Sequence, residues 1–173
     1  MKKLNSVIEQ ANQYIYSLQQ NHLTTDRIST NLVVLYLVDN KACWGHVGDS
    51  RIYKLKNGRL NRLTRDHSII QQLIDKGLLT LKEAAFHSGV KVVGKAIGEK
   101  LKINADVSKI NLHPDDKNRF MICTDGVTEI IGDKEIQESL KKKSLEECSY
   151  ELIMLLENHR NPDDASFIIV DAG

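Results

Sequence analysis

The fold is decided by the stretch Met121-Ile122-Cys123-Thr124-Asp125-Gly126-Val127, in which an apolar run ends in one carboxylate followed by glycine. The run predicts a buried strand, because it is short, apolar and closed by a turn signal. A carboxylate at a strand end is held rigidly at the rim of the sheet, and the glycine allows close approach of a ligand or of the chain. An Asp-Gly pair after a strand is also an ordinary turn signal, so a turn and a ligand site both stay open here.

Two further segments place polar turns beside apolar runs. One is Gly45-His46-Val47-Gly48-Asp49-Ser50-Arg51-Ile52-Tyr53, followed by Leu63-Thr64-Arg65-Asp66-His67-Ser68. The other is Asn161-Pro162-Asp163-Asp164-Ala165-Ser166, just before the last apolar run. Together, in this order, the three motifs resemble the metal-dependent protein serine/threonine phosphatases of type 2C, especially the compact bacterial ones. The likeness runs from about Ala11 to the C-terminus.

The resemblance implies a site for Mn²⁺ or Mg²⁺, ions that prefer oxygen ligands. In the family, Asp125 and Asp163 would be direct metal ligands, and Asp49 would help to bind a third, weaker metal. Gly126 and Asp164 would support this site. From the residues alone, Asp163 after a proline and Asp49 in Gly-Asp-Ser are equally explained as turn residues. The sequence assigns no catalytic residue and no substrate-binding residue.

Two features of the family are missing from the sequence. Family members open with an arginine that binds phosphate, and an Asp-Gly segment follows whose aspartate bridges two metal ions. We therefore expect a type 2C domain that lacks its N-terminal segment and has a weak or incomplete metal site. The second carboxylate of Asp163-Asp164, where the family usually has Asp-Asn, either adds useful charge or repels its neighbour.

The resemblance leaves three functions open. The first is hydrolysis of phosphoserine and phosphothreonine in proteins. The second is a catalytically inactive phosphatase-like binding or regulatory module, completed by a partner chain. The third is hydrolysis of a small phosphate ester with one metal ion. In the family the opening segment supplies strands, and its absence would leave an unpaired sheet edge and exposed apolar surface. We therefore expect a homodimer or a partner chain over the exposed sheet, besides a phosphoprotein substrate or binding partner.

Three other polar side chains have both a chemical and a structural interpretation. Arg51 is suited to binding phosphate, but in this family a structural role fits better. His46 and His67 have the chemistry of general acids. His46 lies on an apolar strand pattern and His67 near a helix start, and both positions favour structural roles.

Composition narrows the class of protein. The 173 residues predict a single domain, and 41% of them are hydrophobic, which is enough for a sizeable core. The net charge is +1, from 24 basic and 23 acidic residues, which predicts neither nucleic-acid nor membrane binding. Three widely spaced cysteines in apolar patterns are expected to be reduced core residues. Without a signal peptide pattern or an apolar run of about 18 residues, a cytoplasmic location is expected.

The order of predicted elements indicates an α+β fold, because strands and helices come in separate runs. This agrees with the family fold, a β-sandwich of antiparallel sheets flanked by helices. Asn57-Gly58 predicts a two-residue hairpin turn. We expect one domain over 1–173, with a flap-like insertion at about 66–98 in which His87-Ser88-Gly89-Val90-Lys91 departs from the family pattern. Helices are predicted over 4–18, 69–74, from 81, 133–140 and 145–156, and strands over 31–38, 41–47, 51–55, 59–63, 103–107, 119–124 and 166–170.

Overall fold

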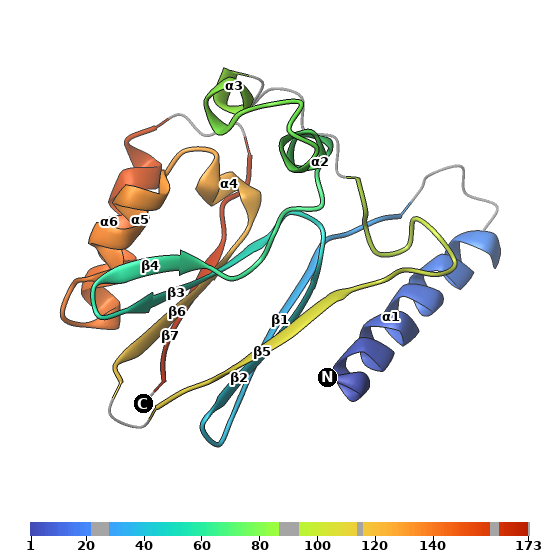
Figure 1. Cartoon of the computed structure of the whole chain (residues 1–173), viewed down its shortest axis with the longest axis horizontal. Coiled ribbons are helices and arrows are strands. Elements are labelled where there is room, and N and C mark those ends of the chain that lie inside the picture. Colours follow the sequence, from blue (N-terminus) through green and yellow to red (C-terminus); the bar gives the residue numbers. More distant parts are fainter. Residues whose placement is uncertain (22–27, 87–93, 114–115, 160–162, 173) are drawn as a thin grey trace. The chain divides into compact units, whose positions relative to one another are not determined.

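The computed structural model describes residues 1–21, 28–86, 94–113, 116–159 and 163–172. The chain divides into two compact units, each built from pieces that are distant in the sequence. The first unit comprises Met1–Tyr36, Cys43–Ser50 and Arg65–Ile110, and the second comprises Leu37–Ala42, Arg51–Thr64 and Asn111–Gly173. Each unit contains most or all of one β-sheet together with its helices (Figure 1).

The first unit is built on a sheet of order β1-β2-β5, and Ile8 of α1 packs against Val47 of β2 in its core. An added Cβ at Gly45 would lie 2.7 Å from Cδ1 of Ile8, so this glycine lets the helix approach the strand closely. Ile97 and Ile103 complete the buried cluster. The elements are α1 (Lys2–Asn21), β1 (Leu32–Val38), β2 (Lys41–Val47), α2 (Ile69–Asp75), α3 (Leu81–Phe86) and β5 (Asp106–Asn111).

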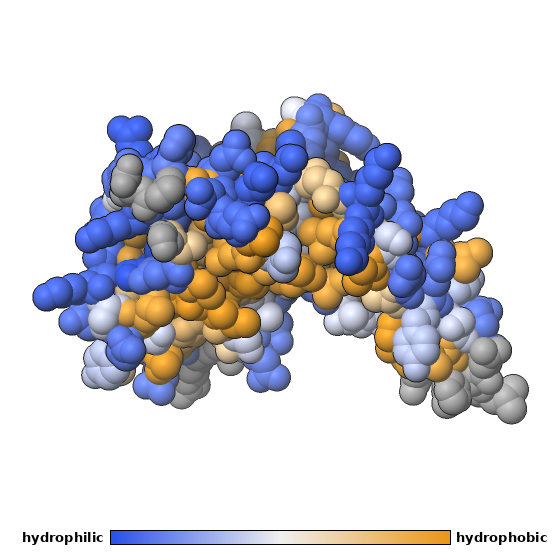
Figure 2. Space-filling view, turned by 90° about the horizontal axis from the view of Figure 1, so that it is seen from below, coloured by the Kyte–Doolittle hydropathy of each residue, from blue (hydrophilic) through white to orange (hydrophobic). Residues whose placement is uncertain are grey.

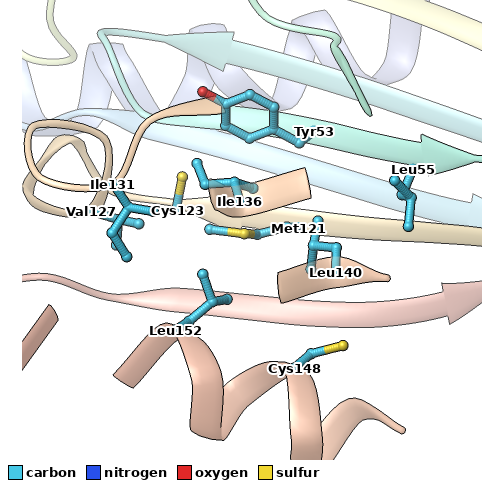
Figure 3. Close-up of a cluster of buried hydrophobic side chains, with 10 residues drawn as sticks. All are labelled: Tyr53, Leu55, Met121, Cys123, Val127, Ile131, Ile136, Leu140, Cys148 and Leu152. Carbon is cyan, nitrogen blue, oxygen red and sulfur yellow. The ribbon is translucent and has the colours of Figure 1, made fainter. Parts of the chain in front are cut away.

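The second unit is built on an antiparallel sheet of order β4-β3-β6-β7. Helices α5 and α6 pack on one face of it, where Met121, Leu140 and Leu152 are fully buried (Figure 3). Asn57 and Gly58 both have positive φ, at 51° and 75°, as the predicted hairpin turn requires. The elements are β3 (Arg51–Lys56), β4 (Arg59–Arg62), β6 (Asn118–Cys123), α4 (Asp125–Thr128), α5 (Asp133–Leu140), α6 (Leu145–Glu157) and β7 (Phe167–Ala172).

Strand β1 is less buried than its sequence predicts. All seven of its residues are apolar or aromatic, yet none is fully buried and Tyr36 is 56% exposed. Its place in the sheet is the reason: β1 is an outer strand, and within the described part of the chain its outer edge pairs with no other strand. Apolar side chains reach the surface on the face shown in Figure 2.

The structure differs from the sequence prediction at three other points. The strand expected over 103–107 is β5, which begins at Asp106 because Ile103 packs into the core of the first unit instead. The helix predicted over 133–140 is α5, and its N-cap is Gly132 and not Asp133 as the polar side chain suggests; the Glu135 side chain accepts from the Gly132 amide at 2.9 Å. The short helix α4 after Asp125 was not predicted, since four residues are too few to show a period.

Several predictions fall on residues outside the described ranges. They concern the flap segment His87–Lys91 and Asn161-Pro162 of the third motif. Among the described residues, Cys123 and Cys148 are buried, as predicted for core cysteines, whereas Cys43 is only half-buried. None of the helices in the described part has the length and apolar character needed to cross a bilayer.

Candidate metal site

Asp125 is positioned by the end of β6 and the first turn of α4. It is the first residue of that helix, and its carbonyl accepts the Glu129 amide at 2.9 Å. Its Oδ1 accepts the backbone N–H of Gly126 at 3.0 Å, which orients the carboxylate at the helix start. A strand-to-helix junction restricts the backbone on both sides, so the carboxylate is held at the sheet rim as the sequence predicts.

The segment that carries Asp163 is fastened to the same junction. The Thr124 amide donates to the Ser166 carbonyl at 3.0 Å, and the Ser166 amide donates to Oγ1 of Thr124 at 3.0 Å. Asp163 accepts the Asp164 amide on its Oδ1 at 2.8 Å. These reciprocal bonds hold the two segments side by side, so two aspartates 38 positions apart in the sequence come together.

Gly126 is required by the closeness of the two segments. An added Cβ would lie 2.5 Å from the Asp164 carbonyl oxygen and 3.3 Å from Cα of Ala165. Both contacts are with backbone atoms, which cannot swing aside as a long side chain can. Gly126 therefore permits the close approach of the two segments that the sequence suggests. Asp164 contributes to this contact through its backbone carbonyl.

Three carboxylates meet at this junction. Asp125, Glu129 and Asp163 each offer one oxygen, and these oxygens all lie within 4.8 Å of one another. Asp125 is half-buried and the other two are exposed. Sequence reasoning missed Glu129, because it faces Asp125 only through the short helix α4, which puts residue i+4 on the same face. The donor set consists only of hard oxygens and suits Mg²⁺ or Mn²⁺ rather than softer metals.

Asp49 belongs to the first unit and has different surroundings. It is only 6% exposed, and its Oδ1 accepts a hydrogen bond of 2.6 Å from Nδ2 of Asn31. Gly48 before it has φ of +110°, and an added Cβ there would meet the Asn31 side chain, so the turn needs glycine. The metal role predicted for Asp49 stays a prediction.

A second cluster of possible ligands, His46, His67 and Asp106, lies within the first unit. The two imidazole rings stack, with centroids 4.5 Å apart and planes 16° from parallel. His46 donates from Nε2 to the Arg65 carbonyl at 2.8 Å. His67 accepts the Gly48 amide on Nδ1 at 3.1 Å, which leaves the proton on Nε2, 3.2 Å from Oδ2 of Asp106.

This histidine pair does not fit a metal ion. A metal lies in the plane of each ring that binds it, and two stacked, nearly parallel rings share no such plane. The Nε2 of His67 also carries a proton in the tautomer that Gly48 selects. Burial lowers the pKa of His67, partly offset by its contact with Asp106, so the neutral ring is favoured. These contacts favour the structural interpretation of both histidines.

Arg51 also has a structural partner. Its Nη1 donates to the Tyr53 hydroxyl at 3.2 Å, and that hydroxyl donates to Oδ1 of Asp133 at 2.8 Å. Burial raises the pKa of Tyr53, which therefore stays a neutral donor. The chain of bonds ties β3 to the start of α5, as the structural interpretation of Arg51 predicts.

The chain can now be placed among known proteins. It is 32% identical over 168 residues to a protein of Streptococcus pyogenes named as a type 2C protein phosphatase, covering 96% of this chain and 67% of that relative. The chain spans 33% of another relative, the serine/threonine protein phosphatase PstP of Mycobacterium tuberculosis. No family model matches it. The chain belongs to the type 2C protein phosphatase family, which confirms the predicted resemblance.

Solved structures confirm the predicted fold class. Serine/threonine phosphatase Stp1 from Staphylococcus aureus superposes with a TM-score of 0.89 at 24% identity, covering 99% of this chain and 66% of that one. The catalytic domain of PstP, solved in complex with two manganese ions, gives a TM-score of 0.84 at 24% identity over 99% of this chain and 70% of that one. The fold is the α+β fold of these phosphatases.

Proposed function

We propose that this chain acts in the metal-dependent hydrolysis of phosphoserine and phosphothreonine in proteins. The observation that carries the proposal is the meeting of Asp125, Glu129 and Asp163 at the end of β6, in a chain of the type 2C family. The proposed substrates are cytoplasmic phosphoproteins in signalling. The proposed ion is Mn²⁺ or Mg²⁺, and the manganese in the PstP structure supports the first.

The three carboxylates define what the chain itself contributes. Asp125, Glu129 and Asp163 would hold the ion, and Gly126 keeps their two segments close enough to do so. When bound, such an ion neutralises charge on phosphoryl oxygens and lowers the pKa of water. Asp125 is the least exposed of the three, and the Gly126 amide orients its carboxylate.

Two finer proposals concern the first unit. We propose that Asp49, oriented by Asn31, contributes to binding a further, weaker metal. We also propose that residues 66–98 form a flap that influences the choice of substrate within a single domain over 1–173. The flap proposal is supported by the way α2 and α3 follow the Asp49 strand–turn motif in sequence.

The test measures Mn²⁺ binding and hydrolysis of a phosphothreonine peptide by the purified chain and by Asp125→Asn. We expect the wild-type chain to bind Mn²⁺ and release phosphate, and the variant to lose both. Glu157→Gln, which removes an exposed carboxylate from α6, is the matched control and should change neither. Equal binding by wild type and Asp125→Asn would refute the proposed ligand set.

A second candidate is a phosphatase-like module completed by another polypeptide. The specific observation is β1, an outer strand with apolar side chains on both faces and no fully buried residue. Such an edge is a template for an added strand. We expect sedimentation velocity to show self-association, or capture of a chain that carries the remaining third of the family's domain. A well-folded monomer that binds no such chain would exclude this candidate.

A further inference from the structure

A groove of about 1090 Å³ lies in the second unit, at the opposite end of β6 from the carboxylates. Its walls are the hairpin turn Asn57-Gly58 with Leu55, residues 116–119 before and within β6, residues 140–143 between α5 and α6, and the end of β7 at 171–172. We call this the basic groove. The six residues of β6 separate its floor from Asp125 by about 17 Å, so it is distinct from the candidate metal site.

Positive charge dominates the basic groove. Five of its lining residues are cationic, namely Lys117, Arg119, Lys141, Lys142 and Lys143, against only two carboxylates. Both carboxylates are already paired: Asp116 with Lys56 at 2.6 Å, and Asp171 with Arg119 at 2.6 Å. The lysines therefore face the solvent with little internal compensation. Since the whole chain carries a net charge of only +1, this concentration is local.

The lysines project from a backbone that Arg119 holds in place. Its Nη1 donates to the Leu140 carbonyl at 2.8 Å and to the Lys142 carbonyl at 2.7 Å, while its Nε binds Asp171. Hydrogen bonding to Asp171 raises the pKa of Arg119, so the arginine is always charged. Three consecutive lysines on a fixed segment lose less conformational entropy on binding than lysines on a mobile loop.

The four lysines of the groove remain available to a ligand, because their ion pairs with the described residues are weak or absent. Lys141 contacts Glu138 and Lys142 contacts Glu151, both exposed pairs that contribute little. No carboxylate of the described residues lies within ion-pair distance of Lys117 or Lys143. The Nε and Nη2 of Arg119 already bind Asp171 bidentately and its Nη1 binds two carbonyls, so this fork is occupied and is not offered to a phosphate. The four lysine ammonium groups lie on different residues, so each can bind a different carboxylate of an acidic ligand.

Asn118 belongs to the lining of the groove, but its side-chain oxygen is buried and does not face a ligand. Asn118 is 2% exposed, and its Oδ1 has no hydrogen-bond donor, while its Nδ2 donates to the Asp116 carbonyl at 3.0 Å. A buried acceptor without a donor is unfavourable. The side-chain amide of Asn118 therefore fixes the backbone at Asp116 and contributes no contact to a ligand.

We infer that the basic groove is a docking site for an acidic peptide segment, rich in Asp and Glu, of a protein partner. The exposed lysines of the groove contact its carboxylates. The volume of the groove exceeds that of most small-molecule sites and suits an extended segment. Nucleic acid fits less well, because none of the lining residues is aromatic and bases would find no stacking surface.

The experiment measures the fluorescence anisotropy of a labelled decaglutamate peptide titrated with the full chain at low salt. The test variant carries Lys117→Gln, Lys141→Gln and Lys143→Gln. The control carries Lys2→Gln, Lys3→Gln and Lys109→Gln, three exposed lysines of the first unit, so both variants lose the same charge. We expect about tenfold weaker binding in the test variant, and binding within about twofold of wild type in the control.

Each alternative outcome overturns the inference. Equal weakening in both triple variants would mean that the peptide responds to net charge and not to the groove. An unchanged affinity in the test variant, or no binding by wild type, would exclude the groove as its site. A labelled decathymidylate that binds more tightly than decaglutamate and is lost in the same variant would make the groove a nucleic-acid surface. Because Asp125 lies outside the groove, loss of hydrolysis in Asp125→Asn leaves this test unaffected.

Discussion

Glu129 is the residue whose role depends most on geometry and least on sequence motif. Its carboxylate reaches the other two only because α4 begins at Asp125, which places the two side chains one helical turn apart. At the scale of single residues, the position where α4 begins therefore determines which carboxylates meet at the site. Asp125 and Asp163 could be predicted as candidates from their motifs, whereas Glu129 carries no motif and follows only from a helix too short to recognise.

The first prediction concerns this residue. Glu129→Gln should weaken Mn²⁺ binding by about 10- to 100-fold, because an amide oxygen replaces a charged ligand. Isothermal titration calorimetry with Mn²⁺ measures the change. The substitution keeps the size of the side chain, so the free energy of unfolding without metal should hardly change. An Mn²⁺ affinity equal to that of wild type would show that Asp125 and Asp163 act without it.

The second prediction concerns Gly126. Gly126→Ala should lower the free energy of unfolding by about 1–3 kcal/mol, because the new methyl group meets the backbone at Asp164 and pushes the two segments apart. Metal affinity should fall with it. Gly132→Ala is the matched control, since its nearest neighbour is the flexible Glu135 side chain at 3.6 Å. Urea unfolding measures the free energy of unfolding of both variants. Equal losses in the two variants would argue against a close backbone contact at Gly126.

At the scale of elements, α6 shows how a periodic pattern becomes stability. Its sequence predicts one apolar stripe, and Leu152 on that stripe is fully buried against the sheet (Figure 3). Ser144 caps the helix by accepting the Glu147 amide at 3.2 Å, and the Glu147 carboxylate accepts the Lys143 amide at 2.9 Å. Long helices and the hairpin turn could therefore be located from sequence, because their signals are local and repeated.

The third prediction compares two neighbours on this helix. Leu152→Ala should cost about 2–5 kcal/mol of unfolding free energy, because it leaves a cavity in the core of the second unit. Ile153→Ala removes a side chain that is 43% exposed and should cost much less. Urea denaturation at neutral pH measures both. Similar losses would mean that α6 does not pack on the sheet as described.

The strands whose surroundings depend on distant residues were predicted less well. The alternation of Ile103, Ala105 and Val107 suggested a strand, but Ile103 and Ala105 join the first unit's core before β5 begins at Asp106. Strand β1 reads as buried from its composition, yet its burial depends on what lies beside an outer strand. Such features depend on tertiary neighbours, which no local pattern encodes.

For the whole molecule, the protonation of His67 links stability to pH. Its pKa in the folded protein is lowered, chiefly by burial, while the unfolded chain keeps a value near 6.5. As pH falls through about 6.5, the unfolded state binds a proton that the folded state resists, so stability decreases. Above that pH both states are neutral and the effect vanishes. Lys95, His46 and Asp106 are the charged or titratable groups near this ring.

The fourth prediction follows from this linkage. Between pH 7.5 and 5.5, where carboxylates remain ionised, the melting temperature of wild type should fall, and that of His67→Gln should fall less. The variant should also be less stable at pH 7.5, because the bond from Gly48 and the stack on His46 are altered. His159→Gln, an exposed histidine, should keep the wild-type slope. Parallel melting curves for all three proteins would contradict the linkage.

The hydrogen bonds from Arg119 to the carbonyls of Leu140 and Lys142 affect the susceptibility of this segment to proteolysis. Lys141, Lys142 and Lys143 form three consecutive trypsin sites on the surface, and cleavage requires the segment to leave its folded conformation. The arginine opposes that opening through two carbonyls. The rate of tryptic cutting in this segment therefore reports how often the arginine releases it. An acidic segment bound in the basic groove should slow this cleavage, so the rate of tryptic cleavage would measure the fraction of the protein that has the groove occupied.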